Sequence, residues 1–489
     1  MAEAPNPLPK LQVAISILIQ AAEALSATVI FPFVPEFVRE TGITGGDERK
    51  TGYWAGVLES IFFVAEFCSV FTWGRASDRF GRRPILLLGP LGLAFSLLGF
   101  GWSKTFVSLV FWRTLQGICN GNIGVVKTVV AELADSTNLA QVSSFISLGW
   151  STGSTLGPII GGLLANPEER WPNSFGKLQI LRDNPYLLPC AAVAFMCLGI
   201  SLLGLVGLKE TSPMAIARQK RKERRLAAAT DPSLTSGLLA DEPVSYGAIP
   251  GTEVASDTNN VEPEDYTDEE PPTVRELLVP RLVIPLVNYG FFCFLQTAYQ
   301  VLFPLMYSTS IPNGGLGFDP FWIGVTRGVY GVANSITVIF LAWRLIRKFG
   351  ARTVYIFSFA QLFICIAAYP ILNFFARRAG RVDGVVWAIV VMQLTSNIAL
   401  SIAYSAIQIF IVNSTPRPSA MSSTNSIAQM VSTISRSLAP LFASSLFAVS
   451  LEMNLAGGYM VYIVLLGTVV AGMFSSFLLV HDPQKQTAE

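Results

Sequence analysis

The sequence predicts an all-α integral membrane protein in which twelve transmembrane helices form two pseudo-symmetric bundles of six. Three observations predict this fold: an apolar composition, twelve long apolar segments and a weak repeat between the two halves of the chain. Of the 489 residues, 51% are hydrophobic and 14% are charged, whereas about 25% of the residues of a soluble domain are charged. Because so few charges could not cover a surface that faces water, the composition excludes a soluble multidomain enzyme. The formal net charge of +1 gives no general attraction to nucleic acid.

A helix that crosses a bilayer needs about 20 mostly apolar residues. Segments of this kind occur at residues 11–34, 54–73, 85–102, 106–131, 142–165, 186–208, 282–308, 321–345, 353–375, 385–412, 420–449 and 457–480. The first segment is longer than the apolar core of a secretory signal and lacks a small-residue cleavage site, so we expect it to be retained as a helix.

Residues 209–280 differ from the rest of the chain. A basic run is followed by acidic residues, and the stretch is rich in Pro, Ser, Thr and Gly. Such a composition cannot bury enough apolar surface to fold. We expect a disordered cytosolic linker here, between an N-terminal bundle (residues 1–208) and a C-terminal bundle with a short cytosolic tail (residues 281–489). The basic run could contact lipid in a regulatory role, and a topological anchor is the simpler interpretation.

Basic residues between the apolar segments indicate which side of the membrane is cytosolic. They gather at residues 75–83 and 344–352, on the same predicted side as the linker and both termini. That side is therefore predicted to be cytosolic. Three arginines at 377–381 fall on the opposite side and break the rule. Plasma membrane and vacuolar membrane both stay open as locations.

The two halves of the chain match weakly. Trp54-x-Gly56-Val57 aligns with Trp322-x-Gly324-Val325, and Leu156-Gly157-Pro158 resembles Leu438-Ala439-Pro440. Parallel six-helix repeats are typical of transporters in which one half rocks against the other around a site at the midplane.

The stretch from Gly74 to Pro84 is short, densely charged and flanked by glycines. Glycine permits a tight turn, and Asp78 can face the positive N-terminus of a neighbouring helix. The arginines can pair with acids at the inner end of segment 106–131. We interpret the stretch as a cytosolic latch; the alternative, a positive-inside anchor alone, would need neither the Asp nor the glycines. The latch would comprise Gly74, Asp78, Arg79, Gly81, Arg82, Arg83, Glu132 and Asp135.

This stretch resembles the G-x-x-x-D-R-x-G-R-R signature of the major facilitator superfamily at every key position. The sequence Arg113-Thr-Leu-Gln116-Gly117 resembles the R-x-x-Q-G motif of that superfamily. The segment 153–162 resembles the G-x-x-x-G-P-x-x-G-G motif of its antiporters, through Gly153, Gly157, Pro158, Gly161 and Gly162.

In detail the chain looks like the fungal twelve-helix proton–drug antiporters, near the tetracycline-exporter and zinc-induced-facilitator-like branches, through Phe31-Pro32 and the segments 55–60 and 73–75. The resemblance implies that Asp78 and the arginines gate the cytosolic side against segment 420–449. It also implies that Arg113 assists proton transfer, and that the glycines and Pro158 let segment 142–165 bend and pack against segment 321–345. The second-half counterpart of the latch has Trp343 and Arg347 in place of the first glycine and the Asp, so we expect it to contribute less.

Charges at bilayer depth cost about 3 kcal/mol each on insertion scales and usually face a cavity or a partner. Besides Lys127, the predicted helices contain Glu23, Glu59, Glu66, Arg113, Arg327 and Arg436. We expect Glu23 to carry a coupled proton, with Glu59, modulated by Arg113, as the second candidate. Glu66 and Arg436 are a candidate pair across the two halves, and Arg327 is a further candidate for such a pair. The alternative is that the carboxylates form structural ion pairs.

A cavity for organic molecules should combine aromatic and a few polar side chains. Candidates that share helix faces are Tyr289, Gln296, Gln300, Asn397, Tyr404 and Gln408. Packing without ligand contact is the alternative for each. None of the six cysteines forms a CxxC pair and the chain has one histidine, so no metal site and no cofactor are predicted.

These observations predict a secondary active transporter, namely a proton-coupled antiporter that exports small organic molecules (drugs or secondary metabolites) by alternating access. Its expected partners are the substrate, protons and membrane lipid, and we expect a monomer. The alternatives are a proton-coupled importer of a nutrient or metal chelator and a non-transporting receptor on the same scaffold. An enzyme is not predicted, because the sequence contains no nucleophile–base set, metal cluster or phosphate loop.

Overall fold

The computed structural model describes residues 9–133, 139–212, 215–216, 279–415 and 421–479. Within these ranges the chain forms helices and no strands. The predicted all-α fold is confirmed. Most of the predicted linker, the end of the C-terminal tail and Asp135 lie outside the described residues.

The first half of the chain contributes one group of helices. They are α1 (Lys10–Thr28), α2 (Val34–Glu40), η1 (Glu48–Lys50), α3 (Thr51–Phe80), α4 (Arg82–Gly101), α5 (Phe106–Asn120), α6 (Ile123–Leu133), α7 (Leu139–Leu164), α8 (Pro167–Arg170), η2 (Phe175–Lys177), α9 (Gln179–Arg182) and α10 (Leu187–Gly207).

The second half contributes a similar group. Its helices are α13 (Pro280–Ser308), η4 (Ile311–Asn313), α14 (Pro320–Thr337), the π-helical η5 (Val338–Ala342), α15 (Trp343–Phe349), α16 (Ala351–Ala379), α17 (Gly384–Asn413), α18 (Met421–Glu452), η7 (Leu455–Gly458) and α19 (Met460–Phe477).

Among the described residues, nine helices are long and apolar enough to cross a membrane, and α14 with the bent residues after it makes a tenth. The two remaining predicted segments are also helical. Residues 106–131 are divided between α5 and α6, on either side of Gly121 and Asn122, and residues 142–165 lie within α7. The protein is therefore a multi-pass membrane protein, because helices of this length and composition match the thickness of the hydrocarbon core.

A proline shapes the end of α1. The apolar segment continues to residue 34, but α1 ends at Thr28 and α2 begins at Val34. Pro32 has no backbone N–H and cannot continue a helix without losing a hydrogen bond. The residues between the two helices form turns instead, and one of them, Phe31, lies at the boundary between the halves.

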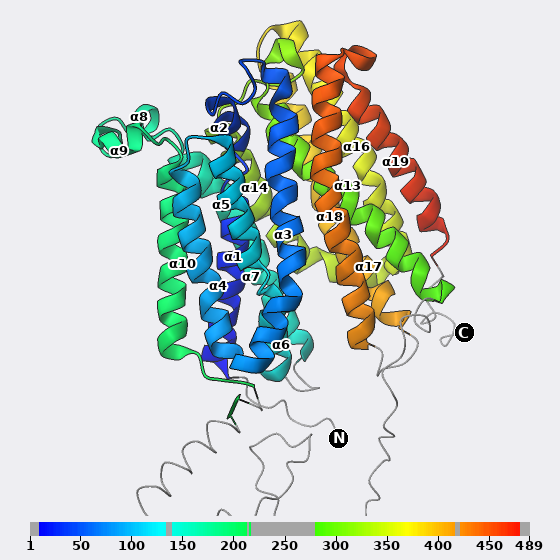
Figure 1. Ribbon diagram of the computed structural model, residues 1–489. Coiled ribbons are helices and arrows are strands. Elements are labelled where there is room, and N and C mark those ends of the chain that lie inside the picture. Colours follow the sequence, from blue (N-terminus) through cyan, green and yellow to red (C-terminus); the bar gives the residue numbers. More distant parts are fainter. Residues whose placement is uncertain (1–8, 134–138, 213–214, 217–278, 416–420, 480–489) are drawn as a thin grey trace, which may run out of the picture.

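The two groups of helices lie side by side: α4 and α10 stand at one edge of the view, α16 and α19 at the other, and α14 is seen between α5 and α3 (Figure 1). They meet where α3 packs against α18 and where α7 packs against α14. Small residues allow the first contact: a Cβ atom on Gly52 would lie 2.5 Å from the Ser444 carbonyl oxygen. Such close packing of helix backbones at small residues is the usual way in which helices associate in lipid. We name the two ends of the molecule the Glu48 end, which carries α2, η1 and η4, and the Gly81 end, which carries the turn between α3 and α4.

Candidate functional site

A buried ion pair joins α3 to α5. The Arg113 Nη2 atom lies 3.1 Å from Glu59 Oε2, and their side chains are 1% and 6% exposed. Arg113 Nη1 also donates to Gln116 Oε1 at 2.6 Å, and the guanidinium lies 4.2 Å from the centre of the Phe62 ring. Arg113 and Gln116 meet because residues three apart share a helix face. The R-x-x-Q spacing therefore presents a cation and an amide together.

The same two side chains hold the end of α1. Gln116 Nε2 donates to the Ser26 carbonyl oxygen at 2.8 Å, and Arg113 Nη2 donates to that of Ala27 at 3.4 Å. The last carbonyl groups of a helix have no partner within the helix. The motif of α5 satisfies two of them in α1, so that three helices meet at one buried cation.

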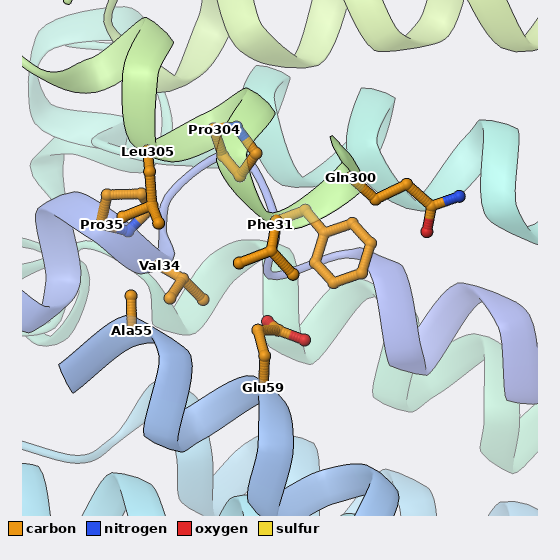
Figure 2. Close-up of a pocket in the computed structure, with 9 residues that line it drawn as sticks. Phe31, Val34, Pro35, Ala55, Glu59, Gln300, Pro304 and Leu305 are labelled. Carbon is orange, nitrogen blue, oxygen red and sulfur yellow. The ribbon is translucent and has the colours of Figure 1, made fainter. Parts of the chain in front are cut away.

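Glu59 also faces a small pocket between the two halves. The first half contributes Phe31, Val34, Pro35, Ala55 and Glu59, and α13 contributes Gln300, Val301, Pro304 and Leu305. Figure 2 shows the Glu59 side chain pointing from α3 into this space. Glu59 is the one ionisable residue among those that line it. The Glu59 carboxylate thus pairs with the Arg113 guanidinium and also lines the pocket between the two halves.

Glu66 lies two turns farther along α3. It accepts a hydrogen bond from Asn120 Nδ2 at 3.2 Å, and it interacts electrostatically with Arg436 of α18. Arg436 lies among Tyr289, Tyr404 and Cys293 as well. The structure therefore brings Glu66 and Arg436 near each other across the two halves.

Glu23 of α1 is fully buried. It accepts a hydrogen bond from Gln20 Nε2 at 3.3 Å. Its side chain is not among those that line the pocket. The side chain of Lys127, in α6, lies outside the described residues.

Arg327 of α14 is 8% exposed. Its Nη2 atom donates to the Gln300 carbonyl oxygen at 3.3 Å, and its guanidinium lies 4.4 Å from the centre of the Phe303 ring. Among the described residues, no carboxylate forms an ion pair with it. The predicted inter-half pairing of Arg327 thus has no counterpart in the part of the chain that the structure describes.

The predicted loop at 74–84 is almost entirely helical. Residues 74–80 continue α3, Arg82 begins α4, and Gly81 alone forms the turn, with φ of 102°. Hydropathy marks where lipid ends and not where a helix ends, so charged residues can extend α3 beyond the membrane. The Asp78 Oδ1 atom lies 2.6 Å from Arg82 Nη1, an i,i+4 pair across the turn.

Glu210, just after α10, is a partner that the sequence analysis missed. Its carboxylate accepts hydrogen bonds from the backbone N–H groups of Arg82 at 2.7 Å and Arg83 at 3.1 Å. An acid at the positive N-terminus of α4 is favoured there. The signal was present, since Glu210 is the first acid after the segment 186–208. The predicted partners of the arginines lie outside the described residues, namely the Glu132 side chain and all of Asp135. The Arg79 guanidinium lies 5.6 Å from the centre of the Phe80 ring.

The glycines of α7 contact two different helices. A Cβ on Gly153, Gly157 or Gly161 would collide with backbone or side-chain atoms of α1 and the turn after it. Gly162 faces α14 instead, where its Cβ would lie 2.5 Å from the Pro320 carbonyl oxygen. Pro158 stays inside the helix. The implied close contact with α14 thus falls to Gly162, and the other three bring α7 against α1.

The predicted cavity residues do not converge on one point. Gln300 lines the pocket. Tyr289 and Tyr404 pack together with ring centres 6.2 Å apart, near Arg436. Asn397 is buried in α17, while Gln296 and Gln408 are half-buried.

Polar contacts join the two halves at the Glu48 end. The Glu48 carboxylate accepts hydrogen bonds from Ser310 N at 2.9 Å, Ser310 Oγ at 2.7 Å and Asn313 Nδ2 at 3.0 Å. Tyr53 Oη donates to Glu452 Oε2 at 3.2 Å, with the Lys50 ammonium 3.9 Å from the same carboxylate. Arg170 and Asp319 form a third link. We call these three links the Glu48-end clasp; sequence reasoning missed it, because each partner lies far away along the chain.

Comparison with known proteins agrees with this architecture. The family model of the Major Facilitator Superfamily matches residues 16–440. The chain is 30% identical to the major facilitator-type transporter psiT2 of Psilocybe cyanescens, over 99% of this chain and 92% of that protein. It is 26% identical to the efflux pump azaK of Aspergillus niger, over 97% and 89% of the two chains.

Solved structures show the same fold. The D-xylose-proton symporter superposes with a TM-score of 0.66 at 16% identity, covering 96% of this chain and 97% of that one. The predicted resemblance is confirmed, and so is the expectation that the protein is a transporter and not an enzyme. The chain belongs to the major facilitator superfamily of membrane transporters.

Proposed function

We propose that the protein is a proton-coupled antiporter that exports small organic molecules by alternating access. The observation that carries the proposal is the position of Glu59, which pairs with Arg113 in a buried site and also lines the pocket between the halves. The name of azaK, an efflux pump, supports export as the direction. Each chain has its own boundary between two halves, so the proposed working unit is a monomer.

The proposed coupling uses two competing influences on one carboxylate. An apolar site favours the neutral carboxylic acid, whereas a neighbouring guanidinium favours the carboxylate. Breaking a buried ion pair without compensation costs about 3–5 kcal/mol. Both residues belong to the first half, so movement of α13 away from Glu59 changes the surroundings of the carboxylate and not its distance to Arg113. In the proposed cycle this movement admits water and a proton to Glu59, and the proton then loosens the pair with Arg113. Binding and release of that proton would then follow the rearrangement of the halves.

This geometry favours Glu59 over Glu23 as the coupling acid. Glu23 is buried within the first half and does not line the pocket, so movement of the second half would not expose it directly. Glu23, our first candidate from the sequence, is therefore the second candidate here.

The Glu48-end clasp supports a defined state in the transport cycle. Its three links all join the two halves at one end of the molecule. The predicted orientation puts the Gly81 end in the cytosol, so the clasp would close the outer side. In the proposed cycle, loss of the clasp opens the outer side while the latch around Asp78 and Gly81 closes the inner side.

Transport by reconstituted protein tests the proposal. A substrate is first identified in efflux-deficient cells with a panel of cytotoxic and fluorescent compounds. Proteoliposomes are then given a proton gradient, and the wild type is compared with Glu59→Gln and with Glu23→Gln, the same chemical change away from the pocket. We expect Glu59→Gln to abolish proton-driven transport and to retain exchange of substrate without a gradient, whereas Glu23→Gln should keep both.

Two results would contradict the proposal. Unchanged proton-driven transport by Glu59→Gln would exclude Glu59 as the coupling acid, and loss in Glu23→Gln alone would transfer the role to Glu23. Movement of substrate in the same direction as protons would exclude antiport and favour the importer.

A further inference from the structure

Arg327 occupies the position in the second half that Glu59 occupies in the first. Each residue stands five positions after the tryptophan that aligns the two halves, Trp54 or Trp322. An aromatic ring follows three positions later in both halves, and each ring lies against a guanidinium: Phe62 against Arg113 at 4.2 Å, and Tyr330 against Arg327 at 6.0 Å. The guanidinium comes from α5 in the first half and from α14 itself in the second, so the two contacts are alike in kind, and the second half has a cation at the position where the first half has the Glu59 carboxylate.

The two arrangements differ in their anion. In the first half the guanidinium of Arg113 meets the Glu59 carboxylate. In the second half the guanidinium of Arg327 has no ion pair with any carboxylate that the structure describes. Arginine stays protonated in proteins and carries five N–H donors. Among the described residues, Arg327 donates one hydrogen bond, to the Gln300 carbonyl oxygen, and its guanidinium lies near the rings of Phe303 and Tyr330.

The backbone of α13 holds Arg327 in place. Pro304 lies inside α13 and has no N–H, so the carbonyl group four residues earlier, that of Gln300, loses its usual helical partner. Arg327 Nη2 donates to that carbonyl oxygen at 3.3 Å. Gln300 and Pro304 also line the pocket opposite Glu59. The cation is thus held by the backbone of a helix that lines the pocket. Arg327 itself is 8% exposed, and neither it nor Tyr299 is among the nine residues that line the pocket, so a ligand would reach them from behind that wall.

Several tyrosines lie within electrostatic range of this cation. Tyr299, Tyr307, Tyr330 and Tyr369 all interact electrostatically with Arg327. Tyr307 donates to Gln393 Oε1 and Tyr369 donates to the Tyr299 carbonyl oxygen. The hydroxyl of Tyr299 is fully buried and has no hydrogen-bond partner among the described residues. A buried hydroxyl without a partner is costly, and an acceptor next to Arg327 would satisfy it.

We propose that Arg327, with the hydroxyl of Tyr299, binds an anionic group of the transported molecule, so that the substrates include organic acids. This inference rests on the proposed function, because it assigns the substrate class of the pocket between the halves. The substrate carboxylate would supply the anion that the second half lacks. A purely structural role, in which Arg327 only satisfies the Gln300 carbonyl, predicts no preference for a charged ligand.

Binding to the purified full-length protein in detergent tests the inference without any need for transport. The probes are naphthalene-1-acetate and 2-(1-naphthyl)ethanol, which share the ring and differ in charge. Titration calorimetry at neutral pH should show that the wild type binds the carboxylate at least about tenfold more tightly, as a charge-assisted hydrogen bond provides. Arg327→Gln should reduce the ratio of the two affinities to near one. Arg344→Gln, which removes an exposed arginine of α15, should leave that ratio unchanged.

The wild-type preference alone can overturn the inference, so the result does not depend on whether Arg327→Gln folds. Equal or undetectable binding of both probes to the wild type would refute it, as would an undiminished preference in Arg327→Gln. Arg327→Lys keeps the charge without the planar fork and should retain part of the preference. A different result would show that the proposed function is wrong. In that case proteoliposomes would show no proton-driven movement of any compound, whatever the affinities measured in detergent.

Discussion

Replacing Gly162 with alanine should weaken the contact between α7 and α14. A Cβ at this position would lie 2.5 Å from the Pro320 carbonyl oxygen and 2.8 Å from the Gly324 Cα atom. Both of those atoms belong to backbone, which cannot rotate away as a flexible side chain can. The two helices would have to separate to accommodate the methyl group.

The size of the effect follows from these distances. Ordinary van der Waals contact begins at 3.4 Å, so the helices must move apart by roughly 0.9 Å at this point. Overpacking of this kind costs about 1–3 kcal/mol. Since 1.4 kcal/mol is a factor of ten in an equilibrium, the state in which α7 and α14 touch should lose about 5- to 150-fold in population relative to states in which they separate.

Thermal unfolding in detergent and transport by reconstituted protein measure this effect. The matched control is Gly199→Ala in α10, where a Cβ would have nothing within 4 Å. We expect Gly162→Ala to lower the melting temperature and the transport rate, and Gly199→Ala to change neither or to stabilise slightly through better helix propensity. Equal behaviour of the two variants in both assays would refute the assignment of Gly162 to a tight helix contact.

Three further substitutions test other parts of the structure. Glu210→Ala removes the acceptor at the N-terminus of α4 and should destabilise the protein by about 1–2 kcal/mol, as loss of a helix cap does; an unchanged melting temperature would contradict this. Glu48→Gln removes charge from the hydrogen bonds with Ser310, each worth about 1.5–3 kcal/mol, so spin-label distances across the Glu48 end should lengthen, and an unaltered distribution would argue against a clasp. Burial raises the pKa of Glu40, in α2 outside the spanning helices, above its ordinary 4.5. The folded state therefore binds more protons than the unfolded chain just above that pH, and stability should fall as pH rises through the raised pKa. Glu40→Gln should make the melting temperature depend less on pH in this range. If the curves of melting temperature against pH were parallel for the wild type and Glu40→Gln, this explanation would be wrong.

The fold could be predicted from the sequence because a spanning helix leaves a one-dimensional signal, its length of apolar residues. That signal marks where the lipid-facing part of a helix ends, but it does not show whether the helix continues beyond the lipid. It placed residues 74–80 in a loop, although they continue α3 to Phe80. It also joined residues on both sides of Pro32 and Gly121, where local backbone chemistry divides the predicted segments into α1 and α2 and into α5 and α6.

The candidate site was predictable only where its partners lie close together in sequence. The R-x-x-Q spacing predicts that Arg113 and Gln116 share a face, and they do. That Arg113 meets Glu59 depends on how α3 packs against α5, which no local pattern encodes. The same holds for the Glu48-end clasp, whose hydrogen bonds connect Glu48 to residues more than 250 positions away.

The energies of these two sets of contacts suggest how they divide the work of the proposed cycle. The ion pairs of the clasp are partly exposed, with side-chain exposures of 43% and 35% for Lys50 and Glu452, and such pairs contribute about 0–1 kcal/mol each. The Glu59–Arg113 pair is almost fully buried, and breaking it costs several times more. The Glu48 link is stronger than the ion pairs of the clasp, because hydrogen bonds to a carboxylate contribute about 1.5–3 kcal/mol each. The clasp therefore holds the Glu48 end closed mainly through Glu48, while the buried pair opposes any rearrangement that separates its partners. Because both partners of that pair belong to the first half, a proton on Glu59 would loosen the packing of α3 on α5 beside the pocket, whereas opening of the clasp would separate the halves.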